Sequence, residues 1–372
     1  MKKTVALLLC LVMVLCCLSG CGTANKSVDD TVMTVNGVKV SWDEYMFWIG
    51  YAAMYLKYQY NMYGAEIDWS AETGGEEGQT NAEWCVDYAK QTVVQKCLIE
   101  AKCNELGVTL DENDKAEIQK SIEEYKVSCC GENATDEQFE AYLKSNENSN
   151  LKVLEDSQSA TALTNKLFDA LFGEGGEKAD AEQLLAKAAE AGYTKANHIL
   201  FLFTNEENEE RTDAEKAAGK AKLEGFMKEL NAIEDTEARY ARFQELKTEN
   251  CEDTGTEAYQ FGEGVMVQDF YDKSLALEPY EMDIVETSYG YHLMIGLPLD
   301  LEYNVTSQSS DPITLRETML NDLFSDELAK WQKDAEVVMA EGFEDFDFST
   351  TFGTGGFIYQ SWADRVAAQS KK

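Results

Sequence analysis

Between residues 195 and 296 the apolar residues of this chain change from a helical period to an extended one. KANHILFLF, residues 195–203, is a short apolar run with the length and composition of a central strand. Two helical patterns, a short strand, a short helix and two strands around a turn follow it. This order, β-α-α-β-α-β-β, predicts an α+β domain built on a small, largely antiparallel sheet, for which we take residues 193–300.

The sequence before this domain has a helical period. Residues 31–192 begin with a hairpin signal, Asn36-Gly37 between two β-branched runs, and continue with long helical segments. Ser41 and Glu44 have the spacing of a capping box ahead of an aromatic-rich helix. We therefore expect a mainly α-helical N-terminal domain, into which the α+β domain is inserted.

The sequence after the α+β domain predicts one more long helix. Asp311 and the proline that follows it are typical of a helix start, and an apolar stripe at three-to-four spacing extends to Val338. Because so amphipathic a helix requires a partner, residues 301–342 are predicted to pack on the N-terminal domain. Residues 343–372 are rich in Gly, Ser and acidic residues and are expected to form a polar tail.

The N-terminus has the layout of a secretory signal. Lys2 and Lys3 precede an apolar stretch that is shorter than the ~20 residues of a stable membrane span. The sequence Leu-Ser-Gly-Cys that ends at Cys21 resembles a bacterial lipobox, in which the chain is cut before the cysteine and its thiol is lipidated. Residues 1–20 are thus predicted to be a lipoprotein signal peptide and residues 21–30 a tether. The alternative is a plain secretory signal with an incidental cysteine.

These features predict a body held by the lipid on Cys21 at the extracytoplasmic face of a bacterial membrane. The formal net charge of −37, or −39 once Lys2 and Lys3 are removed, argues against nucleic acid or an anionic membrane surface as a partner. Most acidic residues lie in predicted helices and are expected to be solvated. A second interpretation is that this negative charge attracts basic, unfolded secreted chains.

Cysteine and histidine limit the chemistry that the chain can support. Export permits disulfides, but the sequence does not decide between pairing and free thiols. It holds no CxxC motif, and with only two histidines, His198 and His292, we predict no metal site. The cysteines of the exported body are Cys85, Cys97, Cys103, Cys129, Cys130 and Cys251.

Four blocks between residues 196 and 299 resemble the parvulin-type peptidyl-prolyl cis/trans isomerase domain. They are the opening strand Ala196–Leu200, the stretch Phe261–Val267 with Asp269-Phe270, the turn Leu277–Glu281 and the closing block Val285–His292. Four blocks in order and at domain spacing are a specific signal, although they cover only about a third of the chain. The whole layout is similar to the PrsA/SurA-like extracytoplasmic foldases, in which a parvulin domain is inserted in a helical chaperone module.

The resemblance implies an enzyme that isomerises X–Pro bonds of unfolded or partly folded secreted polypeptides and acts as a chaperone. Rotation about this bond has a barrier of ~18–20 kcal/mol but breaks no bond, so no cofactor is required. A catalyst must bind the twisted amide better than the planar one, and an apolar proline pocket favours the twisted, less polar form.

The resemblance also implies roles for individual residues. The two histidines should lie side by side on adjacent strands as a hydrogen-bonded pair that fixes tautomers, with Asp253 facing the substrate amide. The residues implied as catalytic are His198, Asp253 and His292, and those implied as substrate-binding are Phe261, Met266, Phe270, Thr287 and Tyr289.

The segment between Asp253 and Phe261, TGTEAYQ, departs from the family pattern. The family usually has a longer Gly-rich stretch there, and Ala258 replaces a larger apolar pocket residue. This altered rim leaves a second hypothesis open, a non-catalytic holdase chaperone that uses the same fold to bind clients. The aromatic helix from Tyr45 to Tyr63 fits that hypothesis, although such residues also serve plain helix packing. The oligomeric state, a homodimer included, stays open.

Overall fold

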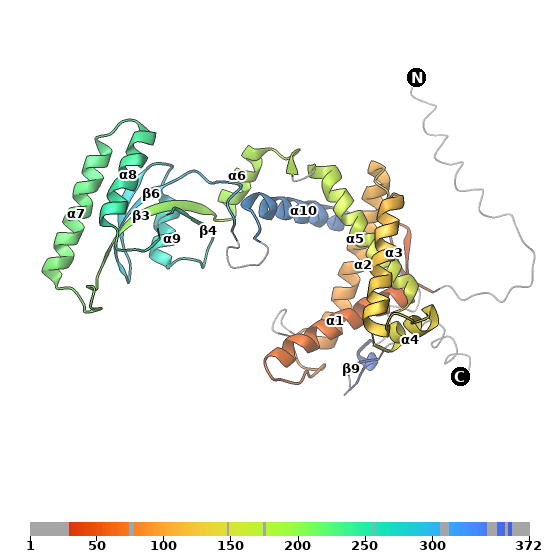
Figure 1. Cartoon of the computed structure of the whole chain (residues 1–372). Helices are drawn as coiled ribbons and strands as arrows, with labels where there is room; N and C mark the ends of the chain where they lie inside the picture. Colours follow the sequence, from red (N-terminus) through yellow and green to blue (C-terminus); the bar gives the residue numbers. More distant parts are fainter. Residues whose placement is uncertain are drawn as a thin grey trace, which may run out of the picture. The chain divides into compact units, whose positions relative to one another are not determined.

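The computed structural model describes residues 30–73, 78–146, 149–173, 176–255, 257–305, 312–340, 348–353 and 356–358 (Figure 1). The predicted signal peptide, the lipidated Cys21 and most of the tether and tail lie outside these ranges. The helices are α1 (Trp42–Met62), α2 (Asn81–Leu106), α3 (Glu112–Cys130), α4 (Asp136–Asn146), α5 (Leu151–Phe172), α6 (Ala181–Glu190), α7 (Asp213–Asn231), α8 (Thr236–Asn250), α9 (Gln268–Ala276) and α10 (Leu315–Lys333). The strands are β1 (Thr31–Val35), β2 (Val38–Ser41), β3 (Thr194–Leu202), β4 (Tyr259–Phe261), β5 (Met282–Glu286), β6 (Gly290–Gly296), β7 (Val337–Met339), β8 (Phe352–Gly353) and β9 (Gly356–Phe357).

Contacts between residues divide the chain into two compact units. The first contains the described residues of Met1–Cys97, Ala116–Gln158 and Ala335–Lys372, and the second those of Leu98–Lys115 and Ser159–Asp334. The predicted domain ranges 31–192, 193–300 and 301–342 stay predictions. None of the helices within the described ranges is apolar over a length that would cross a membrane.

The first unit is built around a small sheet in the order β2-β1-β7. Asn36 and Gly37 have φ values of 50° and 81°, so they form the tight turn that the Asn-Gly signal predicts between β1 and β2. Strand β7 pairs antiparallel with β1, with Val35 opposite Val337. Residues near the end of the chain therefore complete the N-terminal sheet as a strand.

The long helices of the first unit start where their capping residues stand. The side chain of Ser41 accepts a hydrogen bond from the backbone N–H of Glu44 at the start of α1. Thr80 and Glu83 form both bonds of a capping box before α2. The helix α1 buries one face in the core and leaves Tyr and Met side chains exposed on the other, Met62 at 64 % among them.

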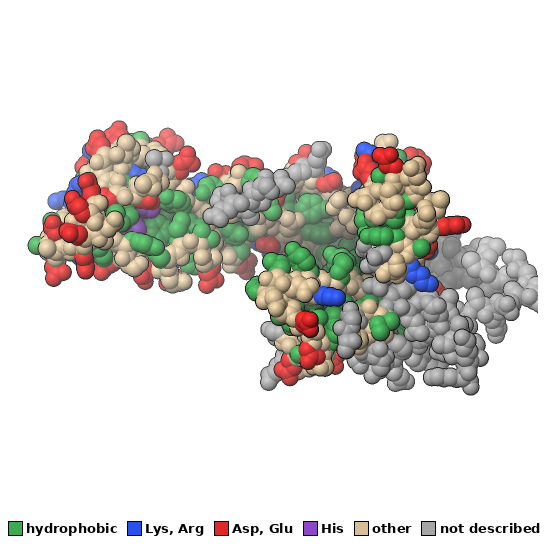
Figure 2. Space-filling model, turned by 60° about the horizontal axis from the view of Figure 1, so that its bottom comes forward, with side chains coloured by type: hydrophobic (Ala, Val, Ile, Leu, Met, Phe, Trp, Pro, Cys, Tyr) green, Lys and Arg blue, Asp and Glu red, His purple; other side chains and the backbone are tan. Residues whose placement is uncertain are grey.

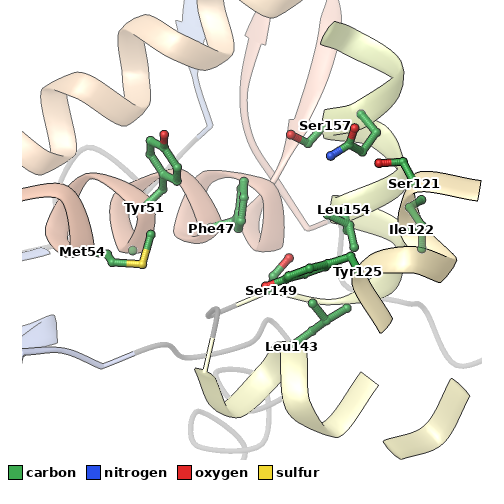
Figure 3. A pocket seen from close by; sticks show the side chains of 12 residues that line it. Phe47, Tyr51, Met54, Ser121, Ile122, Tyr125, Leu143, Ser149, Leu154 and Ser157 are labelled. Atoms are coloured by element: carbon green, nitrogen blue, oxygen red, sulfur yellow. The ribbon is translucent and has the colours of Figure 1, made fainter. Parts of the chain in front are cut away.

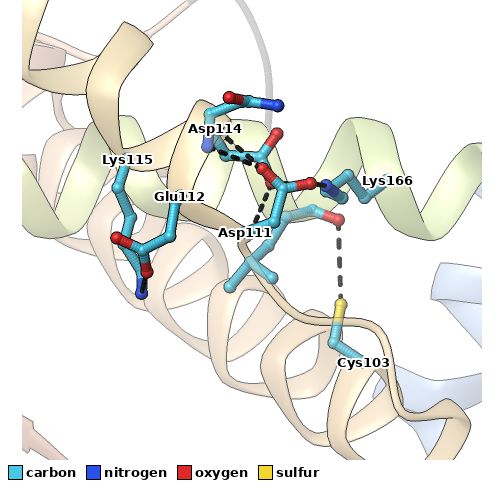
Figure 4. Close-up of polar contacts among 8 residues, drawn as sticks. Cys103, Asp111, Glu112, Asp114, Lys115 and Lys166 are labelled. Atoms are coloured by element: carbon cyan, nitrogen blue, oxygen red, sulfur yellow. Dashed lines mark hydrogen bonds and ion pairs between the residues drawn. The ribbon is translucent and has the colours of Figure 1, made fainter.

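Lys166 of α5 binds the start of α3 through two carboxylates (Figure 4). The side chain of Asp111 accepts hydrogen bonds from the backbone N–H groups of Asn113 and Asp114 at this helix end. Hydrogen bonds from the Asp114 backbone and from Lys166 lower the pKa of Asp111 to about 2. The helix α3 therefore begins directly after Asp111.

The helix α10 packs within the second unit. Its residues Met319 and Leu320 share a buried cluster with Leu184 and Ala188 of α6, and Phe324 contacts the rings of Phe168 and Phe172 on α5. The predicted start at Asp311 is wrong, because Thr314 is the N-cap and forms a capping box with Glu317.

The predicted end of this helix is also wrong, because α10 stops at Lys333 and Val338 belongs to strand β7. The apolar stripe therefore continues across the helix end into a strand that pairs with β1.

The sheet of the second unit has the order β4-β3-β6-β5 and is antiparallel throughout. Along the chain, the elements from β3 to β6 follow the predicted order β-α-α-β-α-β-β. Helices α7 and α8 cover one face, where Leu223 and Phe243 pack on Ile199 and Leu293. Helix α9 lies on the other face (Figure 1), where Phe270 packs against Ala196.

Candidate active site

The two histidines lie on the α9 face of the central strand pair. In the antiparallel register His198 of β3 is opposite Met294 and His292 of β6 is opposite Leu200, so the histidines are diagonal neighbours on one face. Their ring centroids are 5.1 Å apart and the rings meet edge to face at 75°. Each residue is 5 % exposed. Figure 2 shows the small exposed histidine area next to hydrophobic side chains.

Aromatic rings enclose this pair. Phe270 of α9 makes edge-to-face contacts with His198 and His292, at centroid distances of 5.2 and 5.3 Å. Tyr259 of β4 stacks on His198 at 5.8 Å with an interplanar angle of 16°. Phe261, two residues along β4, contacts Phe270 at 5.9 Å. The imidazoles are thus held mainly by ring packing.

The polar contacts of the pair differ from the sequence expectation. His292 Nε2 and Thr287 Oγ1 share a hydrogen bond of 2.9 Å, and the Tyr289 backbone N–H donates to the same hydroxyl oxygen at 3.1 Å. His198 Nε2 lies 3.1 Å from Asp253 Oδ2, but without hydrogen-bond geometry. The expected hydrogen bond between the histidines is wrong, since both Nδ1 atoms and His198 Nε2 have no hydrogen-bond partner among the described residues.

The altered rim is attached to the site by a tyrosine that the sequence reasoning did not select. The Tyr259 hydroxyl donates to Asp253 Oδ2 at 3.1 Å, so the same carboxylate oxygen contacts a phenol and an imidazole. A Cβ atom added at Gly255 would lie 1.8 Å from the Tyr259 hydroxyl oxygen. Glycine at this rim position therefore makes room for the Tyr259–Asp253 bond.

A buried lysine connects the altered rim to strand β3 through hydrogen bonds. Lys247 of α8 is 5 % exposed, and its Nζ donates to Asn197 Oδ1 at 2.7 Å and to the Glu257 carbonyl at 3.3 Å. Asn197 Oδ1 also accepts a hydrogen bond from the His198 backbone N–H at 2.9 Å. Lys247 thus joins the strand that carries His198 to the altered rim. A lysine at a helical position gave no sequence signal for this role.

Burial sets the charge state of the site. It lowers the pKa of His198 to about 4, helped by the Lys247 cation and opposed by Asp253. The pKa of His292 falls to about 3, chiefly through burial and then through His198. Burial alone would raise the pKa of Asp253, but backbone N–H donors, His198 and Tyr259 lower it. At neutral pH the site therefore combines two neutral imidazoles with one carboxylate.

The structure brings most of the expected substrate-binding residues together. Phe261 and Phe270 are each 3 % exposed, and half-buried Met266 packs on the same apolar cluster. Thr287 is buried beside His292, whereas Tyr289 is 59 % exposed. Within the described ranges no three His, Cys, Asp or Glu residues are grouped as metal ligands. The six cysteines of the body, left undecided by the sequence, are free thiols.

An α+β domain with a four-stranded antiparallel sheet, paired histidines on its central strands and an aromatic cluster above them is that of the parvulin-type peptidyl-prolyl isomerases. Comparison with known families agrees, because residues 181–295 match the model of the PPIC-type PPIase domain. The chain therefore carries a PPIC-type domain and is a parvulin-type peptidyl-prolyl isomerase.

Solved structures similar to this chain include three PrsA proteins. PrsA from Bacillus subtilis is 17 % identical, with 72 % of this chain and 92 % of that chain covered and a TM-score of 0.23. The peptidylprolyl isomerase PrsA from Bacillus cereus is 18 % identical, with 72 % and 90 % covered and a TM-score of 0.27. The foldase protein PrsA from Lactococcus lactis is 12 % identical, with 84 % and 95 % covered and a TM-score of 0.25. No curated protein matches the chain. The classification rests on the domain match, since these TM-scores are too low to support a conclusion.

Proposed function

We propose that this protein is a membrane-anchored extracytoplasmic foldase that isomerises X–Pro bonds in secreted polypeptides and also acts as a chaperone. The observation that carries the catalytic part is the pair of neutral, ring-packed imidazoles next to the Asp253 carboxylate, beneath Phe270. Rotation about an amide breaks no bond, so a site of this kind is sufficient for it without a nucleophile.

The proposed mechanism is preferential binding of the twisted amide. In the planar amide, resonance places negative charge on the carbonyl oxygen, and that charge decreases as the bond twists. A carboxylate near this oxygen disfavours the planar form, which is the role we assign to Asp253. The aromatic cluster would receive the proline ring, and His198 and His292 would act as positioning residues. Their neutral state keeps positive charge away from the carbonyl oxygen, where a cation would stabilise the planar form.

A proline-limited refolding assay with the exported chain tests this proposal. The protein should accelerate the slow phase, and Asp253→Ala should lower kcat/KM by about tenfold or more, as expected for one electrostatic contact in a binding-only mechanism. His292→Ala should also lower it, by disturbing the packing of His198. A wild-type protein that leaves the slow phase unchanged would refute the enzymatic proposal.

Anchoring is supported by the lipobox-like sequence at Cys21. In a bacterial host that processes lipoproteins, the wild-type protein should fractionate with membranes and incorporate labelled fatty acid. Cys21→Ser should release the protein and abolish labelling. Labelling that persists in Cys21→Ser would exclude this cysteine as the anchor.

The first unit supports chaperone activity, and on its own it supports the non-catalytic holdase alternative. One side of α1 exposes Tyr51, Met54, Tyr55, Tyr58 and Met62, at fractions between 41 % and 64 %. Phe47, Tyr51 and Met54 also line an open cavity of about 430 Å³, together with residues of α3, α4 and α5 (Figure 3). Exposed apolar area of this kind is typical of surfaces that bind other chains.

Suppression of aggregation by an unfolded client separates the two functions. Replacing Tyr55 and Tyr58 by Ser should weaken suppression and leave isomerisation of a short peptide unchanged. Asp253→Ala should lower the rate of peptide isomerisation and leave the suppression of aggregation unchanged. If Asp253→Ala abolishes suppression while the tyrosine variant does not, the first unit is not the holding surface.

A further inference from the structure

A second cavity lies beside the catalytic face, at the open edge of the sheet. It has a volume of about 310 Å³ and is lined by residues 191–193, by β4 with the turn that follows it, and by residues 303–305. The strand β4 is an edge strand, so the cavity lies where a substrate segment can pass along the sheet. Tyr259 belongs to both sites, because it lines the cavity and its hydroxyl donates a hydrogen bond to Asp253.

The lining of this cavity is aromatic and acidic. Tyr193, Tyr259 and Tyr303 are among its lining residues, and Glu263 is the acidic residue of the lining. Glu263 forms no ion pair with any described residue, whereas Asp300, three residues before Tyr303, already pairs with Lys195. Its charge is therefore free to interact with a ligand.

A lysine of this chain, Lys195, already lies next to one of these tyrosines and a carboxylate. Lys195 Nζ lies 5.7 Å from the centroid of the Tyr303 ring and 3.4 Å from Asp300 Oδ2. Aromatic faces and carboxylates are the two groups that bind an ammonium or guanidinium at the end of an apolar stem. Because Asp300 neutralises Lys195, that lysine does not prevent a second cation from binding near Glu263.

We propose that this cavity is a subsite for a Lys or Arg side chain of the substrate, a few residues from the isomerised proline. The proposal rests on the function proposed above, since it requires a polypeptide substrate, and it adds a preference for basic segments. The cation would lie against the tyrosine rings and pair with Glu263, while the proline lies near Phe270. The formal net charge of −37 favours the approach of the same basic segments but does not select a position along them.

Exchange NMR on short peptides with one X–Pro bond tests the subsite without a coupling protease. Lys, Gln or Glu is placed in turn at each of three positions on either side of the proline. At one position the Lys peptide should have a kcat/KM roughly tenfold above that of the Gln peptide, from one carboxylate and one cation–π contact. The Glu peptide should fall below the Gln peptide at that position. An equal gain at every position would overturn the proposal, because only the net field of the protein acts uniformly.

Three variants of the exported chain locate the effect. Glu263→Gln and Tyr303→Leu should each lower the Lys-to-Gln ratio of kcat/KM towards one. Glu224→Gln, which removes the same charge from an exposed position on α7, should keep the wild-type ratio. An equal loss in Glu224→Gln and Glu263→Gln would refute the subsite. If no peptide is isomerised at all, the proposed function fails; if every peptide is isomerised at the same rate, only the subsite fails.

Discussion

Acidification should destabilise the isomerase domain well above the pH at which its carboxylates titrate, because its two histidines are buried in neutral form. The pKa of His198 is about 4 and that of His292 about 3, against 6.5 for an ordinary histidine. Below pH 6.5 the unfolded chain binds protons that the folded chain does not. Stability is therefore fully present above pH 6.5 and is lost as the pH falls towards 4.

The size of this loss follows from the two pKa differences. Two pH units below the pKa of the unfolded chain, each histidine that stays neutral in the folded chain lowers the free energy of unfolding by about 2.7 kcal/mol. One pH unit corresponds to ~1.4 kcal/mol. Both together set an upper limit of about 5 kcal/mol at pH 4.5. Local rearrangement around a protonated ring reduces the penalty, so we expect about 3 kcal/mol, or roughly 10 °C in the melting temperature. Asp253 adds nothing in this window because its pKa is lowered from 3.8.

The assay benefits from the small number of histidines. With only two in the chain, the imidazole Hε1 resonances of the untagged protein are two signals. Neither should shift between pH 7.5 and 5.5, and the melting temperature of the wild type should fall more steeply below pH 6.5 than that of a variant with Gln at positions 198 and 292. A folded-state midpoint near 6.5 for either ring would refute the reasoning, because that ring would then be solvated.

Two further predictions concern the rim and its support. Gly255→Ala should lower kcat/KM several-fold, because the added Cβ displaces the Tyr259 hydroxyl from Asp253; Tyr259→Phe should cause a similar loss in the same exchange-NMR assay, and full activity in both variants would show that this bond does not matter. Lys247→Met should raise the pKa of His198, since it removes a cation that opposes protonation; an unchanged His198 midpoint in the Hε1 titration would contradict this.

The sequence predicted those features that local patterns determine. The hairpin at Asn36 follows from turn chemistry, and the order of helices and strands in the isomerase domain follows from residue period. The placing of His198 and His292 side by side was implied by the family resemblance and not by a local pattern. The start of the last helix was wrong because two capping signals compete, and the box formed by Thr314 and Glu317 prevails over Asp311. A period of three to four also does not show where a helix ends and a strand begins.

The contacts that the sequence did not predict are those between distant segments. Lys247 has the appearance of a solvated helical residue, and only the tertiary fold places its ammonium between β3 and the rim. Tyr259 lay within the segment that departs from the family pattern and was therefore taken as part of a loss. Neither position carries a local signal, because each acts through partners that are not its neighbours in the helix or strand pattern.

The rim itself bears on how much activity this enzyme has. A shortened rim predicts weak turnover only if it leaves the catalytic carboxylate unrestrained. Here Asp253 is bound by Tyr259, Gly255 makes room for that bond, and the Glu257 carbonyl is tied to Lys247. These two hydrogen bonds hold the rim, so the short segment has less freedom to lose when substrate binds than an unbonded loop of the same length. The departure in sequence is thus better explained as a different way of fixing the Asp253 carboxylate than as loss of the site.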